Sequence, residues 1–365
     1  MAENNGGTKI KALFLTKYSR EGASTRYRFL QYFPYLQLEG IECTFSPLTD
    51  ASYLRNLYAF KRGTLDDYAR ALARRIRALT GIRKYDIVIV EYEILPYFPP
   101  VFELALKLLK IPYIVNYDDA IFHRYNESQN PLVRMFLGNK IDTVMRNATL
   151  VIAGNEYLAD YARKAGAIAV ETLPTVVDMQ RYPVPPAKRE GIFTIGWIGS
   201  PSTTRYLHDI TPALAKVCDG GRGRVVLIGA GTAKLPGVPV ENRLWSESTE
   251  VRDLEECDVG IMPLCDGMWE KGKCGLKTIQ YMACALPVVV SPVGVNRSIV
   301  EEGVNGFLAT SNEEWASALT ALRDDRLLRD RFGGAGRKKV EERYSVQVTA
   351  KKFASLIIET YRGKE

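Results

Sequence analysis

Short apolar runs alternate with amphipathic stretches along the whole chain. In the first half the runs are nearly continuous and rich in β-branched residues, which is typical of strands buried on both faces. They span Lys11–Thr16, Ile41–Phe45, Asp86–Tyr92, Pro112–Tyr117 and Thr149–Ala153. Helical spacing fills the gaps, for example over Tyr27–Leu38 and Asp67–Leu79. This alternation predicts a parallel sheet with helices on both sides.

A proline-rich stretch, Tyr182–Arg189, interrupts the pattern, and because proline breaks helices and ladders it predicts a linker. The pattern then restarts with strands expected at Phe193–Ile198, Arg224–Ile228, Asp258–Met262, Pro287–Ser291 and Gly306–Ala309, and with helices at Tyr206–Cys218, Leu276–Cys284 and Glu313–Leu322. We therefore expect two Rossmann-like α/β domains facing a cleft. The first domain is predicted to span residues 1–183 and the second residues 191–345, with a linker at 184–190 between them. A C-terminal helix at 346–365 is expected to pack back on the first domain.

Composition narrows the class of protein. The 365 residues include 46% hydrophobic and 25% charged residues, which suits two folded domains and excludes a disordered chain. No apolar run approaches the roughly 20 residues that span a bilayer, so a soluble, cytoplasmic protein is expected. The six cysteines form no CxxC pair and there are two histidines, so we expect reduced cysteines and no metal site.

The net charge of +7 includes a dense basic segment, Arg55–Lys84, with nine Lys or Arg residues against Asp66 and Asp67. Such a segment attracts anions, although a solvated helix face explains it equally well. Together with the aromatic run Tyr27–Tyr35, it could dock the protein peripherally on an anionic membrane beside a lipid-linked acceptor. No aromatic-basic ladder is present, so nucleic acid is not an expected partner.

Two loops at predicted strand ends carry candidate anion sites. Gly199 and Ser200 end the first strand of the second half, and the following turn would expose backbone N–H groups at a helix start. A tight strand–helix turn without a ligand is the alternative. The stronger signal is the segment 269–287, where Lys273 and Lys277 are spaced i, i+4 around Gly275. Amides and ammonium groups in this arrangement suit a diphosphate, whereas the alternative is an ordinary lysine-rich helix start.

Several stretches in this order resemble the retaining GT-B glycosyltransferases called glycosyltransferase family 4, or glycosyl transferases group 1. They are GWIGSPSTTRYL (196–207), DVGIMPL (258–264), GKCGLKTIQYMACALPVVVSPVGVN (272–296), EEGVNGFLA (301–309) and GRKKVEERYS (336–345). The first half fits a subgroup of the same family at Asp118-Asp119-Ala120, GNEYLADYA (154–162) and LPTVVD (173–178). The resemblance implies the GT-B fold, a nucleotide-diphosphate-sugar donor, and neither metal nor cofactor.

The resemblance also assigns roles to residues. The family motif has two glutamates separated by seven residues, and this chain has Gly272 and Gln280 at those positions. Gln280 would bind the ribose hydroxyls, and Glu270 would reach the donor sugar in place of Gly272. The diphosphate would be bound by residues of the segment 269–287 and by one basic residue of the loop that follows Gly199. This set comprises Lys273, Lys277, the amides of Cys274, Gly275 and Leu276, and Arg205.

In the first half, Asp118 and Asp119 follow a predicted strand where many relatives carry a histidine. One of them is expected to orient an acceptor or donor hydroxyl, with a turn cap as the alternative. Adjacent aspartates lack the Asp-x-Asp spacing of metal-dependent glycosyltransferases.

We therefore expect a retaining, metal-independent hexosyltransferase of polysaccharide biosynthesis that acts on a glycan or lipid-linked acceptor. Relatives are thought to use the leaving phosphate as the base. An epimerase or phosphorylase is a rival within the same fold. The alternative outside enzymes is a degenerate subunit that binds a nucleotide sugar or a partner without turnover.

Overall fold

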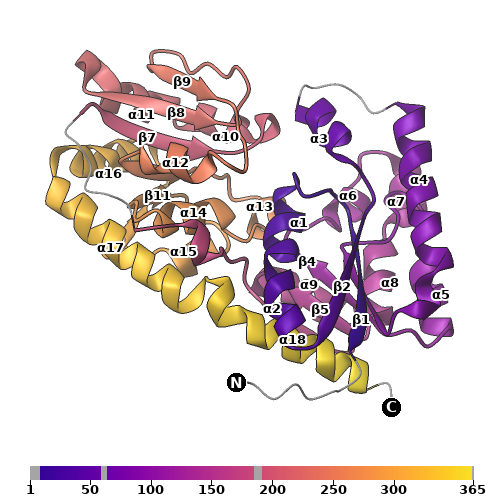
Figure 1. Cartoon of the computed structure of the whole chain (residues 1–365). Helices are drawn as coiled ribbons and strands as arrows, with labels where there is room; N and C mark the ends of the chain where they lie inside the picture. The colour runs from indigo at the N-terminus through magenta and orange to yellow at the C-terminus, as the bar shows by residue number, and fades with distance from the viewer. Residues whose placement is uncertain (1–8, 59–63, 185–190, 364–365) are drawn as a thin grey trace, which may run out of the picture. The chain divides into compact units, whose positions relative to one another are not determined.

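The chain folds into two compact units, each built on a six-stranded sheet in which every strand pair is parallel (Figure 1). The computed structural model describes residues 9–58, 64–184 and 191–363. The first unit comprises Met1–Thr175 and Thr349–Glu365, and the second comprises Val176–Val348. The predicted α/β class is confirmed. Apart from Val184, the expected linker lies outside the described residues.

The first sheet has the strand order β2-β1-β3-β4-β5-β6. Its strands are β1 (Ile10–Thr16), β2 (Ile41–Pro47), β3 (Ile87–Glu91), β4 (Tyr113–Tyr117), β5 (Leu150–Ala153) and β6 (Val170–Thr172). The helices are α1 (Ala23–Arg28), α2 (Phe33–Leu38), α3 (Ala51–Tyr58), α4 (Leu65–Thr80), α5 (Val101–Leu108), α6 (His123–Asn126), α7 (Pro131–Leu137), α8 (Lys140–Asn147) and α9 (Glu156–Lys164). Most of α18 (Val346–Arg362) also belongs to this unit.

Helix α18 is attached to the first unit by aromatic and polar contacts. The Tyr32 and Phe353 rings meet edge to face with their centroids 5.0 Å apart. The hydroxyls of Tyr32 and Thr349 are 2.9 Å apart, and the Lys352 ammonium lies 2.9 Å from Glu171. Because Tyr32 is buried, its ring contributes packing and its hydroxyl still finds a polar partner.

The second sheet has the strand order β12-β11-β10-β7-β8-β9. Its strands are β7 (Phe193–Ile198), β8 (Gly223–Ile228), β9 (Val240–Arg243), β10 (Val259–Met262), β11 (Val288–Val290) and β12 (Gly306–Leu308). The helices are α10 (Arg205–Asp209), α11 (Thr211–Cys218), α12 (Glu250–Glu255), α13 (Met268–Lys271), α14 (Leu276–Ala283), α15 (Asn296–Ile299), α16 (Asn312–Asp324) and α17 (Arg326–Arg343).

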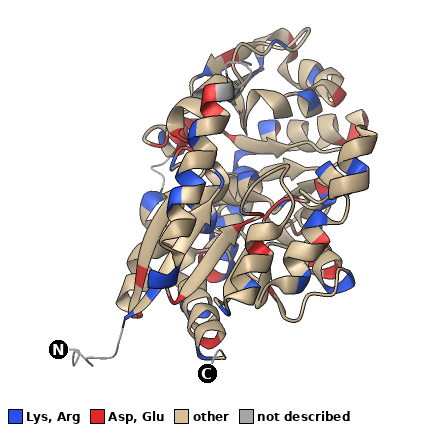
Figure 2. Cartoon of the chain, turned by 90° about the vertical axis from the view of Figure 1, so that its right-hand side faces the viewer, with Lys and Arg blue, Asp and Glu red and all other residues tan. Residues whose placement is uncertain are grey.

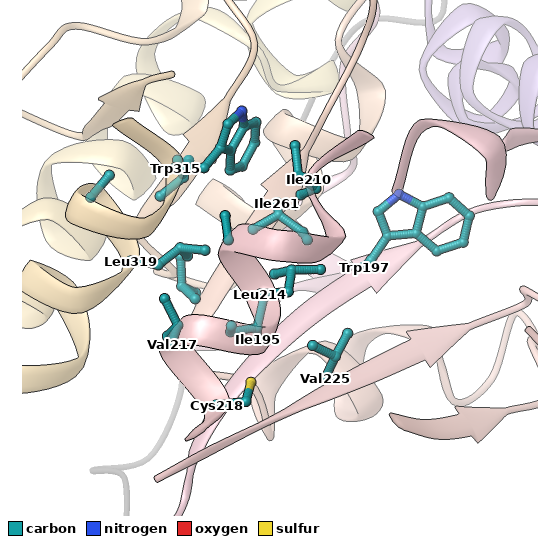
Figure 3. Packing of buried hydrophobic residues seen from close by; sticks show 14 of the residues in the cluster. Ile195, Trp197, Ile210, Leu214, Val217, Cys218, Val225, Ile261, Trp315 and Leu319 are labelled. Carbon is teal, nitrogen blue, oxygen red and sulfur yellow. The ribbon is translucent and has the colours of Figure 1, made fainter. Parts of the chain in front are cut away.

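The core of the second unit forms where α11 and α16 pack over the central strands. Leu214 and Val217 of α11 and Leu319 of α16 pack on Ile195 of β7, with their side chains directed toward one another (Figure 3). The indole of Trp197 lies at the margin of this cluster (Figure 3). Burial of these apolar side chains stabilises the central strands β7 and β10, and the loops at the carboxyl ends of these strands carry the candidate site.

The structure differs from the predicted elements in two ways. Two expected helices are each divided, since Pro34 and Pro212 have no N–H to donate to the preceding turn. Strands β6 and β9 are short and only half-buried, and they lie at the sheet edges. They carry no continuous apolar run, so the hydrophobic pattern does not predict them.

Candidate functional site

In the second unit, the structure brings Lys277 and Gly199 together at the carboxyl ends of the strands. Lys277 lies in the first turn of α14, and its ammonium sits over the Trp197 ring, 4.2 Å from the ring centroid. Gly199 follows β7, and a Cβ at this position would be 2.6 Å from Lys277 Nζ. Only glycine therefore leaves the ammonium in this place. The two segments were predicted separately, and parallel-strand topology joins them at one edge.

The start of α14 is a second source of positive potential beside that ammonium. Gly275 caps the helix with φ of +69°, a conformation that glycine adopts without a Cβ penalty. Leu276 is the first helical residue, and the first-turn N–H groups of any helix have no intrahelical acceptor. Cys274 is buried before the turn, with Sγ 3.7 Å from the Gly272 carbonyl. This part of the chain can present backbone donors to an anion.

The electrostatics of Lys277 are unusual for a lysine. Burial, with a smaller contribution from the charge of Lys273, lowers the pKa of Lys277 to about 7. Lys273 itself lies 6.0 Å from the centroid of the Trp269 ring. Two ammonium groups in this position repel each other, so an anion between them would relieve the repulsion and restore the Lys277 charge.

Glu270 and Arg205 form a separate polar group around Tyr206. The hydroxyl of Tyr206 donates to Glu270 Oε1, and Arg205 Nη2 donates to Tyr206 Oη at 2.9 Å. Arg205 Nη2 also lies 3.4 Å from Glu270 Oε1. The Glu270 side chain is buried, whereas that of Arg205 is 67% exposed. The exposed guanidinium remains accessible to a ligand.

The other predicted donor residues have internal contacts. Gln280 is buried on α14, and its Nε2 donates to the hydroxyl of Tyr182 at 3.4 Å. Tyr182 is tied to the same helix through Arg337, which donates to the carbonyls of Tyr182 and Ala283. The hydroxyl of Ser200 lies 3.0 Å from that of Ser202. The contact between Gln280 and Tyr182 joins residues 98 positions apart, so no local sequence signal announces it.

In the first unit, both oxygens of Asp118 accept internal hydrogen bonds at the carboxyl end of β4. Ser24 Oγ donates to Oδ2 at 2.6 Å, and the Tyr92 hydroxyl donates to Oδ1. Tyr92 has φ of +65°, which is rare for a residue with a Cβ and is stored strain at this edge. Burial and the charge of Asp119 raise the pKa of Asp118. Asp118 therefore holds together the ends of β3, β4 and α1.

Asp119 is half-buried and lies near a charged group that the sequence did not single out. Burial, followed by the charge of Arg124, lowers the pKa of Lys17 to about 8, while the charges of Glu93, Glu91 and Asp119 act in the opposite direction. Lys17 N and Thr25 Oγ1 both donate to Glu91 Oε2 at 2.7 Å. Burial, with the charge of Asp118, raises the pKa of Glu91 to about 7. Lys17 follows β1 and Glu91 is the last residue of β3. Their positions at strand ends are the only feature of the sequence that points to them.

Two features are absent from the part of the chain that the structure describes. Residues 9–58, 64–184 and 191–363 hold no helix that is both long and apolar enough to cross a membrane. In the same ranges, no group of three or more His, Cys, Asp or Glu side chains is arranged to bind a metal ion.

The chain matches known proteins in sequence over its second half and in fold over nearly its full length. Residues 191–325 match the family model described as glycosyl transferases group 1. Sucrose-phosphate synthase from Thermosynechococcus elongatus has a TM-score of 0.71 at 13% identity, covering 97% of this chain and 100% of that chain. HepE from Anabaena, solved with UDP-glucose, has a TM-score of 0.70 at 18% identity, covering 96% of this chain and 100% of that chain.

The α,α-trehalose 6-phosphate synthase from Burkholderia multivorans has a TM-score of 0.63 at 12% identity and covers 97% of this chain and 98% of its own. None of the curated proteins compared with this sequence matches it. The structural likenesses confirm the GT-B fold that the sequence resemblance predicted.

Proposed function

We propose that this glycosyltransferase transfers a sugar from a nucleotide-diphosphate sugar, with retention at the anomeric carbon. Two findings support the proposal: residues 191–325 match glycosyl transferases group 1, and the chain has the GT-B fold. The observation that carries the proposal is the Lys277 ammonium, placed beside Gly199 at the first turn of α14. The acceptor is a glycan or a lipid-linked sugar in polysaccharide biosynthesis.

The proposed chemistry depends on charge at the diphosphate. As the glycosidic bond breaks, the leaving nucleotide diphosphate gains negative charge. The first-turn amides at Gly275 and Leu276, together with Lys273 and Lys277, would stabilise this charge more strongly in the transition state than in the ground state. The leaving phosphate would itself remove the proton from the acceptor hydroxyl. The proposal includes neither a metal ion nor a cofactor.

The remaining site residues have supporting roles in the proposal. Arg205 would contact the diphosphate from its exposed position, with Glu270 holding the guanidinium and facing the donor sugar. Gln280 would contact the ribose from the Tyr182 side of α14. Asp119 would orient the acceptor hydroxyl, while Asp118, with both oxygens already accepting hydrogen bonds, would position the loop that carries Asp119.

Calorimetry with a panel of nucleotide sugars, followed by an assay for nucleotide release, tests the proposal. Replacing Lys273 or Lys277 by alanine should lower kcat/KM by about tenfold or more per lost charged contact. Wild-type rates in both variants would contradict the role of this segment. Binding of a nucleotide sugar without nucleotide release, in the presence of glycan and lipid-linked acceptors, would instead support a subunit that does not turn over.

Peripheral association with an anionic membrane at its cytoplasmic face is a further part of the proposal. Tyr68, Leu72 and Ile76 are exposed at i, i+4 and i+8, so they share one outward face of α4. Arg70 and Arg77 of the same helix are also exposed. Figure 2 shows the right-hand side of the view in Figure 1, with Lys and Arg in blue. An exposed apolar stripe with arginines beside it suits an anionic lipid surface.

Other residues expected on that surface are internal. The Tyr27, Phe29 and Tyr32 rings are buried, so the expectation that this aromatic run contacts a membrane is wrong. Arg75 is also buried and donates to the Thr16 carbonyl at 2.7 Å, because it lies on the inner face of α4.

Sedimentation with phosphatidylcholine vesicles, with and without phosphatidylglycerol, tests the membrane proposal. The wild-type protein should pellet with the anionic vesicles at low salt, and Leu72→Asp should remain in the supernatant. Leu244→Asp, which changes an exposed leucine of the second unit, is the matched control. Equal pelleting of the Leu72→Asp and control variants would contradict this surface.

A further inference from the structure

The ammonium of Lys17 lies at the carboxyl end of β1 and forms no ion pair with any residue that the structure describes. Its Nζ lies 5.2 Å from the centroid of the Tyr18 ring and 5.7 Å from that of Tyr92. Among the described residues, no carboxylate lies within ion-pair distance of it. Glu91 accepts from the Lys17 backbone N–H rather than from the side chain. The charges of Glu93, Glu91 and Asp119 favour the protonated form of Lys17, but none of these carboxylates is in direct contact with its ammonium. A half-buried ammonium gains free energy from a directly bound anion, so this side chain can bind one from a ligand.

A second cation makes the surroundings more positive. Arg124 is exposed, and its charge adds to burial in lowering the pKa of Lys17. The charge of Arg124 also lowers the pKa of Tyr18, against the dominant effect of burial. The charge of Asp119 raises the pKa of both Lys17 and Tyr18. Asp119, the carboxylate proposed to orient the acceptor hydroxyl, therefore lies close to these two side chains. We name Lys17, Tyr18, Tyr92, Asp119 and Arg124 the Lys17 cluster.

Tyrosines surround the Lys17 cluster. Burial raises the pKa of Tyr53, and this pKa also responds to ionisation of Tyr18, Tyr68 and Tyr97 and to the charge of Arg124, so these side chains belong to its surroundings. Tyr68 and Tyr97 are exposed, and Tyr18 and Tyr53 are half-buried. Tyrosine offers an apolar face for the C–H groups of a sugar ring and a hydroxyl for its oxygens.

The loop that carries Tyr97 is held rigidly. Tyr97 has φ of +57°, and its N–H donates to the Tyr125 hydroxyl at 3.0 Å. Tyr125 in turn donates to Glu93 at 2.8 Å, and buried Lys140 also donates to Glu93. A strained backbone fixed by a buried ion pair presents its side chains in one arrangement, which is a feature of binding sites.

We propose that the Lys17 cluster binds an anionic group of the acceptor, with the surrounding tyrosines against the adjoining sugar. The inference rests on the proposed function, since it names the chemical class of acceptor for that reaction. The shared chemistry is a phosphate or carboxylate attached to a hexose. One source is the phosphate that links a sugar to a lipid, and the other is the carboxylate of a uronic acid within a glycan.

Titration calorimetry with glucose, glucuronate and glucose 1-phosphate tests the proposal. UDP is present in excess to occupy the donor side, and Lys277→Ala protein without UDP provides a second measurement free of that side. At least one of the anionic sugars should bind about tenfold or more tightly than glucose. The preferred anion identifies the source: glucose 1-phosphate indicates the lipid phosphate and glucuronate indicates the uronic acid.

Three variants assign the anion to Lys17. Lys17→Gln should abolish the preference for the anionic sugar, and Lys17→Arg should retain it. Lys164→Gln, which removes an exposed charge at the last residue of α9, is the matched control and should behave as wild type. Equal binding of charged and neutral sugars, or an unchanged preference in Lys17→Gln, would overturn the proposal.

Donor binding is read separately from the intrinsic fluorescence of tryptophan. All four tryptophans (Trp197, Trp245, Trp269 and Trp315) belong to the second unit. UDP should therefore change this fluorescence equally in wild type and in Lys17→Gln, which also shows that the variant is folded. Absence of any nucleotide effect would count against the proposed donor, while the anion preference of the Lys17 variants would still decide the present inference.

Discussion

Lys277 should take up a proton when a nucleotide sugar binds. In the free protein, burial and the neighbouring charge of Lys273 hold the pKa of Lys277 at about 7, and its ammonium rests on the Trp197 ring at 4.2 Å. A diphosphate beside this group favours the charged form and raises the pKa. Above pH 7 the binding-competent ammonium is therefore the minor form of the free protein, and its formation weakens the observed affinity.

The size of the effect follows from the pKa of the free protein. With a pKa of about 7, roughly nine-tenths of Lys277 is charged at pH 6 and roughly one-tenth at pH 8. Since the apparent Kd is the intrinsic Kd divided by the competent fraction, it should rise about tenfold between these two pH values. At pH 8, close to one proton should be taken up for each nucleotide sugar bound.

Titration calorimetry between pH 6 and pH 8 measures both quantities. UDP-glucose is a suitable probe because both of its phosphates are esterified and keep their charge over this range. At pH 8, the dependence of the binding enthalpy on the ionisation enthalpy of the buffer gives the number of protons taken up. Lys277→Arg is the control, because a guanidinium remains charged throughout and its affinity should be nearly independent of pH.

Two results would refute this reasoning. One is a wild-type affinity that is as independent of pH as that of Lys277→Arg. The other is a pH-dependent affinity without net proton uptake at pH 8, which would assign the titration to a different step.

Three further predictions concern the surroundings of the site. Gly199→Ala would place a methyl group 2.6 Å from the Lys277 ammonium, so kcat/KM should fall about tenfold; an unchanged value would refute that placement. Glu91 has a pKa raised to about 7, so its contribution to stability is lost as pH rises through 7, and Glu91→Gln should gain in Tm relative to wild type between pH 5 and pH 8. Parallel Tm profiles would contradict this. Lys140→Met leaves buried Glu93 without its ammonium partner and should cost about 3–5 kcal/mol in urea unfolding, whereas Lys140→Met with Glu93→Gln should cost clearly less; equal losses would argue against the pair.

The central strands of both sheets are predictable because burial on both faces demands nearly continuous apolar runs. The edge strand β9 is not, since its sequence VENR carries no such run. The apolar spacing over Tyr27–Leu38 predicts one continuous helix. The structure divides it, because the proline in the first turn of α2 has no N–H to donate to the preceding turn. Local pattern therefore predicts the buried framework better than its edges and breaks.

The candidate site was partly predictable for a similar reason. Gly199 and Lys277 each follow an apolar strand, and parallel topology brings such positions to one edge. The place of Trp197 under the ammonium depends on side-chain packing, which no spacing rule gives. The bond between Ser24 and Asp118 joins residues 94 positions apart, so it becomes visible only in the folded chain.

A crystal structure of the protein with UDP bound would show whether the first turn of α14 and Lys277 hold the diphosphate. We expect the two phosphates at the first turn of α14, with an oxygen within hydrogen-bond distance of Lys277 Nζ and of a backbone amide among residues 275–277. A nucleotide bound elsewhere, with the Lys277 ammonium still resting on the Trp197 ring, would contradict it.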